Sequence, residues 1–258
     1  MSIQENDLDS YRTAAKLIKA SRYTVVFTGA GLSTPSGIPD FRSADIGLWQ
    51  KNDPMLVASL TTFTHHPDRF YRWLRPLLQT SRQAMPNPAH QAISELGNHG
   101  LIQCVITQNI DSLHQKAGSS NVVELHGSME SFHCPACHHA AKDTRALLDE
   151  ILNGQIPHCP HCNATMKPDI TLYEEALPEK AWRLASDAVE KAEVMIVAGS
   201  SLEVIPASSL PYDAYRHGCR IIMVNLSPTF MDSHSEVVIH DDVSVALPMI
   251  LEQTLAVE

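Results

Sequence analysis

Short apolar runs alternate with longer stretches of helical periodicity along most of this 258-residue chain. The apolar runs predict strands at residues 23–28, 101–106, 121–125, 193–198, 220–225 and 236–240. Apolar residues at helical spacing predict helices at residues 7–20, 66–82, 87–97, 178–191, 206–217 and 243–256. Because strands and helices alternate, the sequence predicts an α/β fold with a mostly parallel sheet.

Two segments interrupt this alternation. Residues 43–90 carry helical patterns without a strand, and residues 129–178 contain four cysteines and many histidines. We expect both to be insertions that together form a smaller lobe, a helical part and a metal-binding part. The sheet domain would then be discontinuous, made of residues 1–42, 91–128 and 179–258. Ligands of such sheets bind beyond the carboxyl ends of the strands, so a cleft between the lobes is the expected site.

Charge and composition narrow the possible partners and compartment. The net charge is −10, which argues against nucleic acid as a direct partner. The acidic N-terminal stretch lacks the features of a secretion signal, and no apolar run approaches the roughly 18 residues of a membrane span. We therefore expect a cytoplasmic protein with no membrane partner. Six cysteines in that compartment indicate metal binding or simple burial rather than disulfides.

Four of the cysteines form two C-x-x-C pairs, Cys134 with Cys137 and Cys159 with Cys162, with 21 residues between the inner cysteines. Two such pairs can surround one zinc ion with a closed tetrahedron of thiolates. A closed site leaves no coordination position for a substrate, so the sequence predicts one structural zinc ion. Cys104 and Cys219 lie in strand patterns and are expected in the core. Five nearby histidines are interpreted as solvated loop residues: His133, His138, His139, His158 and His161.

A glycine-rich loop, Gly29-Ala30-Gly31, follows the first predicted strand. Such a loop lets the backbone approach a pyrophosphate. A dinucleotide site of the hydride-transfer type would have a third glycine where this chain has Thr34, and two prolines follow. The sequence therefore disfavours an ordinary dehydrogenase.

Three other strand ends are polar. "TQNIDSLH" occupies residues 107–114, "ELHGS" residues 124–128, and "AGSSLEVIPA" residues 198–207. Each stretch alone is also compatible with turn residues that cap helices. Because the carboxyl ends of parallel strands meet at one edge of a sheet, these side chains are expected to converge.

In combination, these motifs resemble the sirtuin family of NAD-dependent protein lysine deacylases. The resemblance runs from about residue 10 to residue 250. It rests on "GAGLSTPSGIPDFR", "TQNIDSLH", "LHG", the paired C-x-x-C, "GSSLEVIPA" and "VN" at 224–225, in the order of the family. It implies a Rossmann-like sheet domain that binds NAD, with the inserted lobe carrying zinc.

The resemblance implies a reaction that moves the acyl group of an acyl-lysine protein or peptide to ADP-ribose and releases nicotinamide. His126 and Asn109 are the expected catalytic residues, with His126 as the general base that takes a proton from a ribose hydroxyl. NAD contacts are implied at Gly29, Ala30, Gly31, Ser36, Ile38, Asp40, Phe41, Arg42, Gln108, Asn109, Ile110, Asp111, Gly199, Ser200, Ser201, Asn225 and Val243.

The resemblance also implies how a peptide substrate binds. The peptide would lie as an extra strand between residues 170–175 and 202–205, held mostly through its backbone. Substrate contacts are implied at Phe41, Thr171, Glu174, Glu175 and Val204.

The chain departs from the family pattern at three positions. Ser112 and Glu174 stand where glycine is usual, and Ser200 where threonine is usual. Glu174 would add negative charge beside the peptide groove and favour basic residues there. Sirtuins that prefer acidic acyl groups have an arginine three positions after a tyrosine; here Tyr71 is followed at that position by Leu74, which favours neutral acyl groups.

Two other functions remain open from the residues. A protein mono-ADP-ribosyltransferase would use the same NAD pocket, although such family members often lack the histidine base. A non-catalytic module that binds NAD or ADP-ribose would have no need of His126.

Overall fold

A six-stranded parallel sheet forms the centre of the computed structural model, which describes residues 5–40, 47–50 and 53–256. Its strands lie in the order β3-β2-β1-β6-β7-β8. They are β1 (Thr24–Thr28), β2 (Cys104–Thr107), β3 (Val122–Glu124), β6 (Val194–Ala198), β7 (Arg220–Val224) and β8 (Val237–Ile239). All six overlap segments that the sequence predicts as strands, because each contains a short run of apolar residues.

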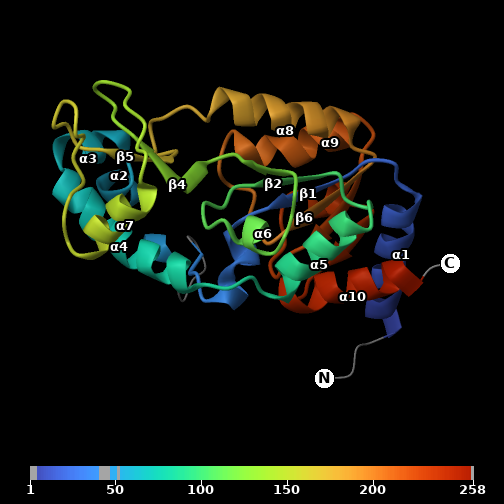
Figure 1. Cartoon of the computed structure of the whole chain (residues 1–258). Helices are drawn as coiled ribbons and strands as arrows, with labels where there is room; N and C mark the ends of the chain where they lie inside the picture. Colours follow the sequence, from blue (N-terminus) through green and yellow to red (C-terminus); the bar gives the residue numbers. More distant parts are fainter. Residues whose placement is uncertain (1–4, 41–46, 51–52, 257–258) are drawn as a thin grey trace.

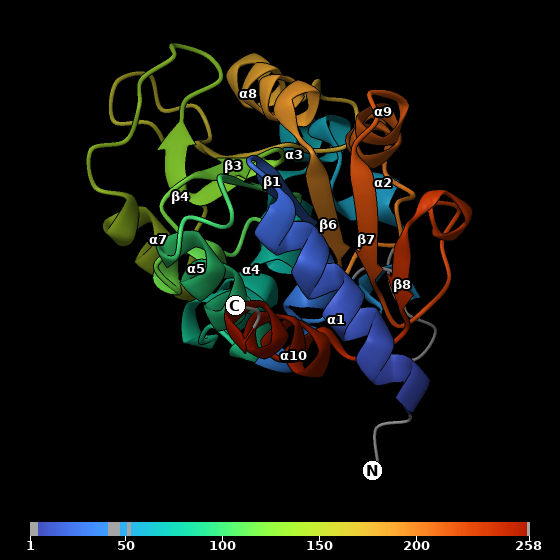
Figure 2. The same ribbon diagram turned by 90° about the vertical axis from the view of Figure 1, so that its right-hand side faces the viewer.

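Helices cover both faces of this sheet (Figures 1 and 2). One face packs against α1 (Glu5–Ala20), α5 (Pro88–Asn98) and α10 (Val243–Ala256). The other packs against α8 (Glu179–Lys191) and α9 (Leu210–Arg216). Two separate clusters of buried apolar side chains fill these interfaces, so the central strands are hydrophobic on both faces.

A second, smaller group of elements lies beside the sheet (Figure 1). An antiparallel pair, β4 (Gly127–His133) and β5 (Lys167–Ile170), packs with the helices α3 (Leu60–His65), α4 (Pro67–Gln83) and α7 (Thr144–Leu152). The short helix α2 (Pro54–Val57) packs on α3 and α4. Phe63 and Tyr71 from the first inserted segment share a hydrophobic cluster with Phe132 and Ile151 from the second. The predicted α/β fold with an inserted lobe is thus confirmed, whereas the residue boundaries of its domains stay a prediction.

The strand order indicates where a ligand-binding cleft lies in the sheet domain. Counting outward from β1, the chain adds β2 and β3 on one side and β6, β7 and β8 on the other. This reversal leaves a crevice at the carboxyl ends of β1 and β6, where ligands of open parallel sheets bind. Two short 3-10 helices, Ala30–Leu32 and Thr34–Ser36, follow β1 in place of an α-helix. The short helix α6 (Leu113–Lys116) begins close behind β2.

Among the described residues, the helices are all too short or too polar to cross a lipid bilayer.

Candidate active site

The loops that follow β1 and β6 approach each other unusually closely. The Gly29 N–H donates to the Ala198 carbonyl at 3.2 Å, and the Gly31 N–H donates to the Gly199 carbonyl at 2.9 Å. Gly199 has φ of +61°, and a Cβ atom added there would lie 2.2 Å from the Leu32 nitrogen. A side chain at this position is therefore excluded by both backbone conformation and space.

A cavity of about 460 Å³ opens at this edge of the sheet. This is within the usual size range of small-molecule sites. The cavity is lined by these residues expected from the sequence: Gly29, Ala30, Gly31, Asp40, Gln108, Asn109, His126, Gly199, Ser200, Ser201, Val204, Asn225 and Val243. Side chains from the ends of several strands do converge here.

The protonation of His126 is set by a backbone carbonyl. Its Nδ1 lies 2.9 Å from the carbonyl oxygen of Gln108, which can only accept, so Nδ1 carries the proton. A neutral imidazole then has Nε2 free as the base. Burial lowers the pKa of His126, and the hydrogen bond to Gln108 raises it by a smaller amount. The ring is therefore neutral near pH 7 and able to accept a proton.

Gln108 and Asn109 connect the strand ends around the cavity. The Gln108 side-chain nitrogen donates to the Ser200 hydroxyl at 3.0 Å. The Asn109 side-chain nitrogen donates to the Gly29 carbonyl and the Ser33 hydroxyl, each at 3.1 Å. Because these bonds use the Asn109 nitrogen, Oδ1 is the atom that this side chain offers to a ligand.

Asp111 is not one of the residues that line the cavity. One carboxylate oxygen accepts from the Ser33 hydroxyl at 2.6 Å, and the other accepts from the Leu113 N–H at 2.9 Å. Asp111 is buried, and its side chain supports the loop that carries Asn109.

Ser36, Ile38 and Ile110, which the sequence also predicts as site residues, are not part of the lining of this cavity. The Ser36 hydroxyl accepts from Asn87, Ile38 is half-buried, and Ile110 packs against the hydrophobic cluster of the smaller lobe. Phe41 and Arg42 lie outside the described residues, so their expected roles stay predictions.

Five cavity residues were not expected from the sequence: Thr34, Leu226, Ser227, Pro228 and Asp242. Leu202 and Glu203 also line the cavity, and they belong to the segment 202–205 that was expected beside the peptide. Leu226, Ser227 and Pro228 directly follow Asn225, so extending that motif past β7 would have included them. Asp242 accepts hydrogen bonds from the Ser244 backbone and hydroxyl at the start of α10. An aspartate directly before a predicted helix, with a serine two residues later, is typical of a helix start and could have indicated Asp242.

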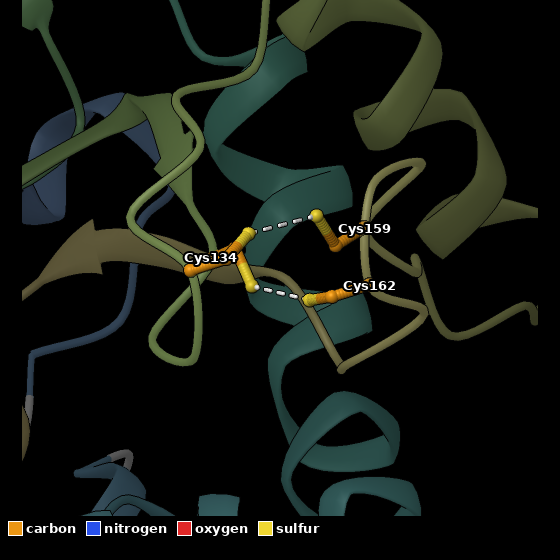
Figure 3. Close-up of side chains that lie close together, drawn as sticks. Cys134, Cys159 and Cys162 are labelled. Carbon is orange, nitrogen blue, oxygen red and sulfur yellow. Dashed lines mark hydrogen bonds between the residues drawn. The ribbon is translucent and has the colours of Figure 1, made fainter.

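The four cysteines of the two C-x-x-C pairs come together in the smaller lobe (Figure 3). Their sulfur atoms all lie within 4.8 Å of one another. Cys134 and Cys162 are 3.4 Å apart, and Cys137 and Cys159 are 3.6 Å apart. Thiolates around a tetrahedral zinc ion are separated by about 3.8 Å, given bonds of about 2.3 Å. The residues therefore fit one structural zinc ion.

The two cysteine turns share one backbone conformation. In each turn the carbonyl of the first cysteine accepts a hydrogen bond from the N–H four residues later. His138 donates to Cys134, and Asn163 donates to Cys159. Both donor residues have φ near +60°. The histidines of the segment contribute no nitrogen to the four-sulfur cluster, and His138, His158 and His161 are exposed. Cys104 and Cys219 are buried in the sheet domain, as predicted.

Comparison with known proteins decides the family. The sequence profile of the Sir2 family matches residues 29–206. The chain is 42% identical over 246 residues to the NAD-dependent protein deacylase 2 of Archaeoglobus fulgidus, covering 95% of this chain and 96% of that protein. The chain belongs to the Sir2 family.

Solved structures of Sir2 proteins have the same fold. A Sir2 homologue in complex with NAD superposes with a TM-score of 0.86 at 34% identity, covering 94% of this chain and 93% of that chain. A Sir2 protein bound to a myristoylated histone peptide superposes with a TM-score of 0.80 at 37% identity, covering 95% and 96%.

The cavity of this Sir2 chain fits NAD. The close approach of Gly29 and Gly31 to Gly199 leaves backbone rather than side chains facing the space at the strand ends. Such a surface suits a pyrophosphate, which backbone groups can approach closely only where no Cβ intervenes.

Both glycine departures of this Sir2 chain have positive φ angles. Ser112 has φ of +58° and Glu174 has φ of +76°. The left-handed conformation that glycine adopts freely is therefore retained with a side chain, at a cost of roughly 1–2 kcal/mol for each residue. The Glu174 carboxylate is not free in solvent, since it accepts a hydrogen bond from the Thr61 N–H at 2.8 Å.

Two buried histidines, one on α5 and one on α6, pack against each other. The rings of His90 and His114 are 5.0 Å apart, and both are almost fully buried. The Thr28 hydroxyl donates to Thr107, so it accepts the Nε2–H of His114 at 3.0 Å. Both ring nitrogens of His90 lack a hydrogen-bond partner among the described residues. Burial lowers the pKa of both histidines, so both are neutral when folded.

This pair predicts that the fold is sensitive to acid. Below the ordinary histidine pKa of about 6.5, the unfolded chain binds protons that the folded chain does not. Stability therefore falls as the pH drops, by about 1.4 kcal/mol per pH unit for each histidine. Urea unfolding of wild type and His90→Phe between pH 7 and pH 5 measures this. The free energy of unfolding of His90→Phe should change less steeply with pH than that of wild type, by the contribution of one histidine. An unchanged slope would show that His90 is not held neutral.

The zinc site predicts a second outcome. Cys159→Ser should lose the one zinc ion per chain, because three thiolates do not close the tetrahedron. Metal analysis and limited proteolysis measure this loss, with increased cleavage between residues 129 and 168. Cys219→Ala is the control and should keep its metal. Full zinc content in Cys159→Ser would contradict the assignment.

Proposed function

We propose that the cavity at the carboxyl ends of β1, β2 and β6 is the active site for the activity of this protein, NAD-dependent removal of acyl groups from lysine side chains of proteins. The observation that carries the proposal is the geometry of His126. Its Nδ1 proton is held by Gln108, and its ring lines the same cavity as the glycine-lined strand ends. The Archaeoglobus relative is named a deacylase, and Sir2 structures contain NAD and an acylated peptide, which supports the same activity here.

NAD would be held by residues of several strand ends. The backbone of residues 29–31 and 199–201 is proposed to face the phosphates, with Arg42 over them, and Gln108 to face the nicotinamide ribose. Asn225 and Val243 would lie at the adenosine end. Asn109, with Ser36, Ile38, Ile110 and Asp111 around it, would surround the nicotinamide amide group; Asp40 and Phe41 complete the proposed set. When bound, NAD supplies a cleavable nicotinamide–ribose bond and the ADP-ribose acceptor of the acyl group.

His126 is the proposed general base. Nε2 is the unprotonated nitrogen, and partial burial keeps the ring neutral near pH 7. Its proposed task is to accept a proton at Nε2 from a ribose hydroxyl. Asn109 would help to orient the reacting groups through Oδ1.

The peptide is proposed to pair with residues 170–175 on one side and 202–205 on the other. The Thr171 N–H donates to the carbonyl of His126 at 2.8 Å, so the substrate segment and the base share a backbone connection. Thr171, Glu174, Glu175, Val204 and Phe41 are the proposed contacts. Leu74 is buried in the smaller lobe, and we propose neutral acyl groups as substrates.

The zinc ion is proposed to hold the smaller lobe together, because four thiolates leave no site for substrate. We further propose that the protein acts in the cytoplasm, without a nucleic-acid or membrane partner. None of the six cysteines, all of which lie in the described residues, forms a disulfide, which supports the compartment. The net charge of −10 argues against a nucleic-acid partner. We propose residues 1–42, 91–128 and 179–258 as the sheet domain, with insertions at 43–90 and 129–178.

The proposed function predicts the behaviour of His126→Ala. Loss of a general base should slow deacylation of an acetyl-lysine peptide about a hundredfold to ten-thousandfold. Mass spectrometry of the peptide with NAD measures turnover. His99→Ala, at an exposed histidine, should keep full activity. Metal content and thermal unfolding should match wild type, and full activity of His126→Ala would contradict the role.

The same assay with labelled NAD separates the deacylase from an ADP-ribosyltransferase. A deacylase releases label as free acyl-ADP-ribose and nicotinamide, whereas a transferase fixes labelled ADP-ribose on protein. Tight binding of NAD without nicotinamide release would instead indicate a binding module.

A further inference from the structure

The segment 171–175 is fixed at several points between the candidate base and α3. The Thr171 N–H donates to the His126 carbonyl at 2.8 Å. The Tyr173 N–H donates to the Ala58 carbonyl, and the Tyr173 carbonyl accepts from Leu60, both at 3.0 Å. The segment thus connects the strand end that carries His126 to the start of α3.

Glu175 holds this segment against the buried Lys167, a contact that we call the inner anchor. One carboxylate oxygen accepts from the Leu172 N–H at 2.8 Å and lies 2.9 Å from the Lys167 ammonium. Lys167 is almost fully buried and also donates to the Ile170 carbonyl at 2.7 Å. A buried ammonium is stable only when paired in this way, so the inner anchor is firm.

Glu174 holds the segment against the start of α3, a contact that we call the outer anchor. Its carboxylate accepts from the Thr61 N–H at 2.8 Å, in the first turn of α3. The Ser59 hydroxyl accepts from the next N–H, that of Thr62, at 3.1 Å. Glu174 and Ser59 therefore satisfy two neighbouring donors that a helix start leaves without intrahelical partners. The hydrogen bonds with Thr61 lower the pKa of Glu174, so the carboxylate stays ionised at neutral pH.

The backbone of Glu174 makes this outer anchor necessary. Its φ of +76° is a conformation that residues with a Cβ atom adopt rarely. Without the bond to Thr61, residue 174 would sample other conformations and carry residues 173 and 175 with it. Only part of the population would then present the segment as an edge for an added strand. Apparent substrate affinity falls in proportion to that fraction.

We propose that Glu174 is a positioning residue for the acyl-peptide substrate: its bond to the first turn of α3 holds segment 171–175 in the conformation that pairs with the peptide. This inference rests on the proposed function. It assigns the carboxylate to α3 rather than to basic residues of the substrate, and it makes α3 part of the substrate-binding apparatus.

The experiment compares Glu174→Ala, Glu174→Gln and the control Glu190→Ala, an exposed glutamate on α8. Steady-state rates are measured with two acetyl-lysine peptides, one with neutral and one with basic flanking residues. In Glu174→Ala we expect KM to rise about three- to tenfold for both peptides, which corresponds to the typical net contribution of one hydrogen bond. The KM for NAD and kcat should stay at the wild-type values. Glu174→Gln should be close to wild type, because its amide oxygen can still accept from Thr61.

Three results would overturn the inference. The first is a wild-type peptide KM in Glu174→Ala. The second is a rise for the basic peptide alone, shared by Glu174→Gln, which would place the carboxylate on the substrate. The third is a fall in kcat with an unchanged peptide KM, which indicates only less folded enzyme.

Hydrogen exchange of the Thr61 amide tests the anchor without any turnover. It should be faster in Glu174→Ala than in wild type and protected in Glu174→Gln; equal rates in all three would contradict the proposal. A wild-type enzyme without NAD-dependent turnover but with this exchange pattern would contradict the proposed function and leave the anchor confirmed.

Discussion

The close approach of the loops after β1 and β6 is the constraint on which the site depends. The Gly31 N–H bonds directly to the Gly199 carbonyl, and the backbone around Leu32 occupies the space where a Gly199 side chain would be. This contact fixes two strand ends at the point where the strand order reverses, and the cavity forms beside them. The polar side chains after β2 attach to the same frame, since Asn109 bonds to the Gly29 carbonyl and Gln108 to Ser200.

A second backbone contact connects the sheet domain to the smaller lobe. Gly127, directly after His126, has φ of +75°, and a Cβ atom there would lie 1.9 Å from the Asp169 carbonyl oxygen. This lets β4 and β5 meet closely, so the His126 carbonyl can accept from Thr171. His126, the expected peptide edge and the zinc-binding turns are therefore parts of one continuous structure. The four cysteines lie in the loops that follow β4 and precede β5, at the other end of this strand pair from His126 (Figure 3).

The sequence predicts the sheet well because its strands are short apolar runs between clear helical patterns. It does not predict β4 and β5, whose sequences "GSMESFH" and "KPDI" are polar, interrupted by proline and without a clear alternation. The cysteine set follows from spacing alone. The sequence identifies Asn109 and Asp111 as one polar motif but cannot tell which way each side chain points. In the fold, Asn109 lines the cavity, while Asp111 turns to Ser33 and the start of α6. The bond from Glu174 to Thr61 joins residues 113 positions apart, so no local pattern could indicate it.

Hydrogen–deuterium exchange with and without NAD tests the assignment of the cavity most directly. We expect NAD to protect backbone amides at residues 29–33, 107–110, 199–204 and 225–228, with α7 in the smaller lobe unchanged. NAD binding that leaves those four strand ends unprotected, or that protects a different face of the sheet, would contradict the account.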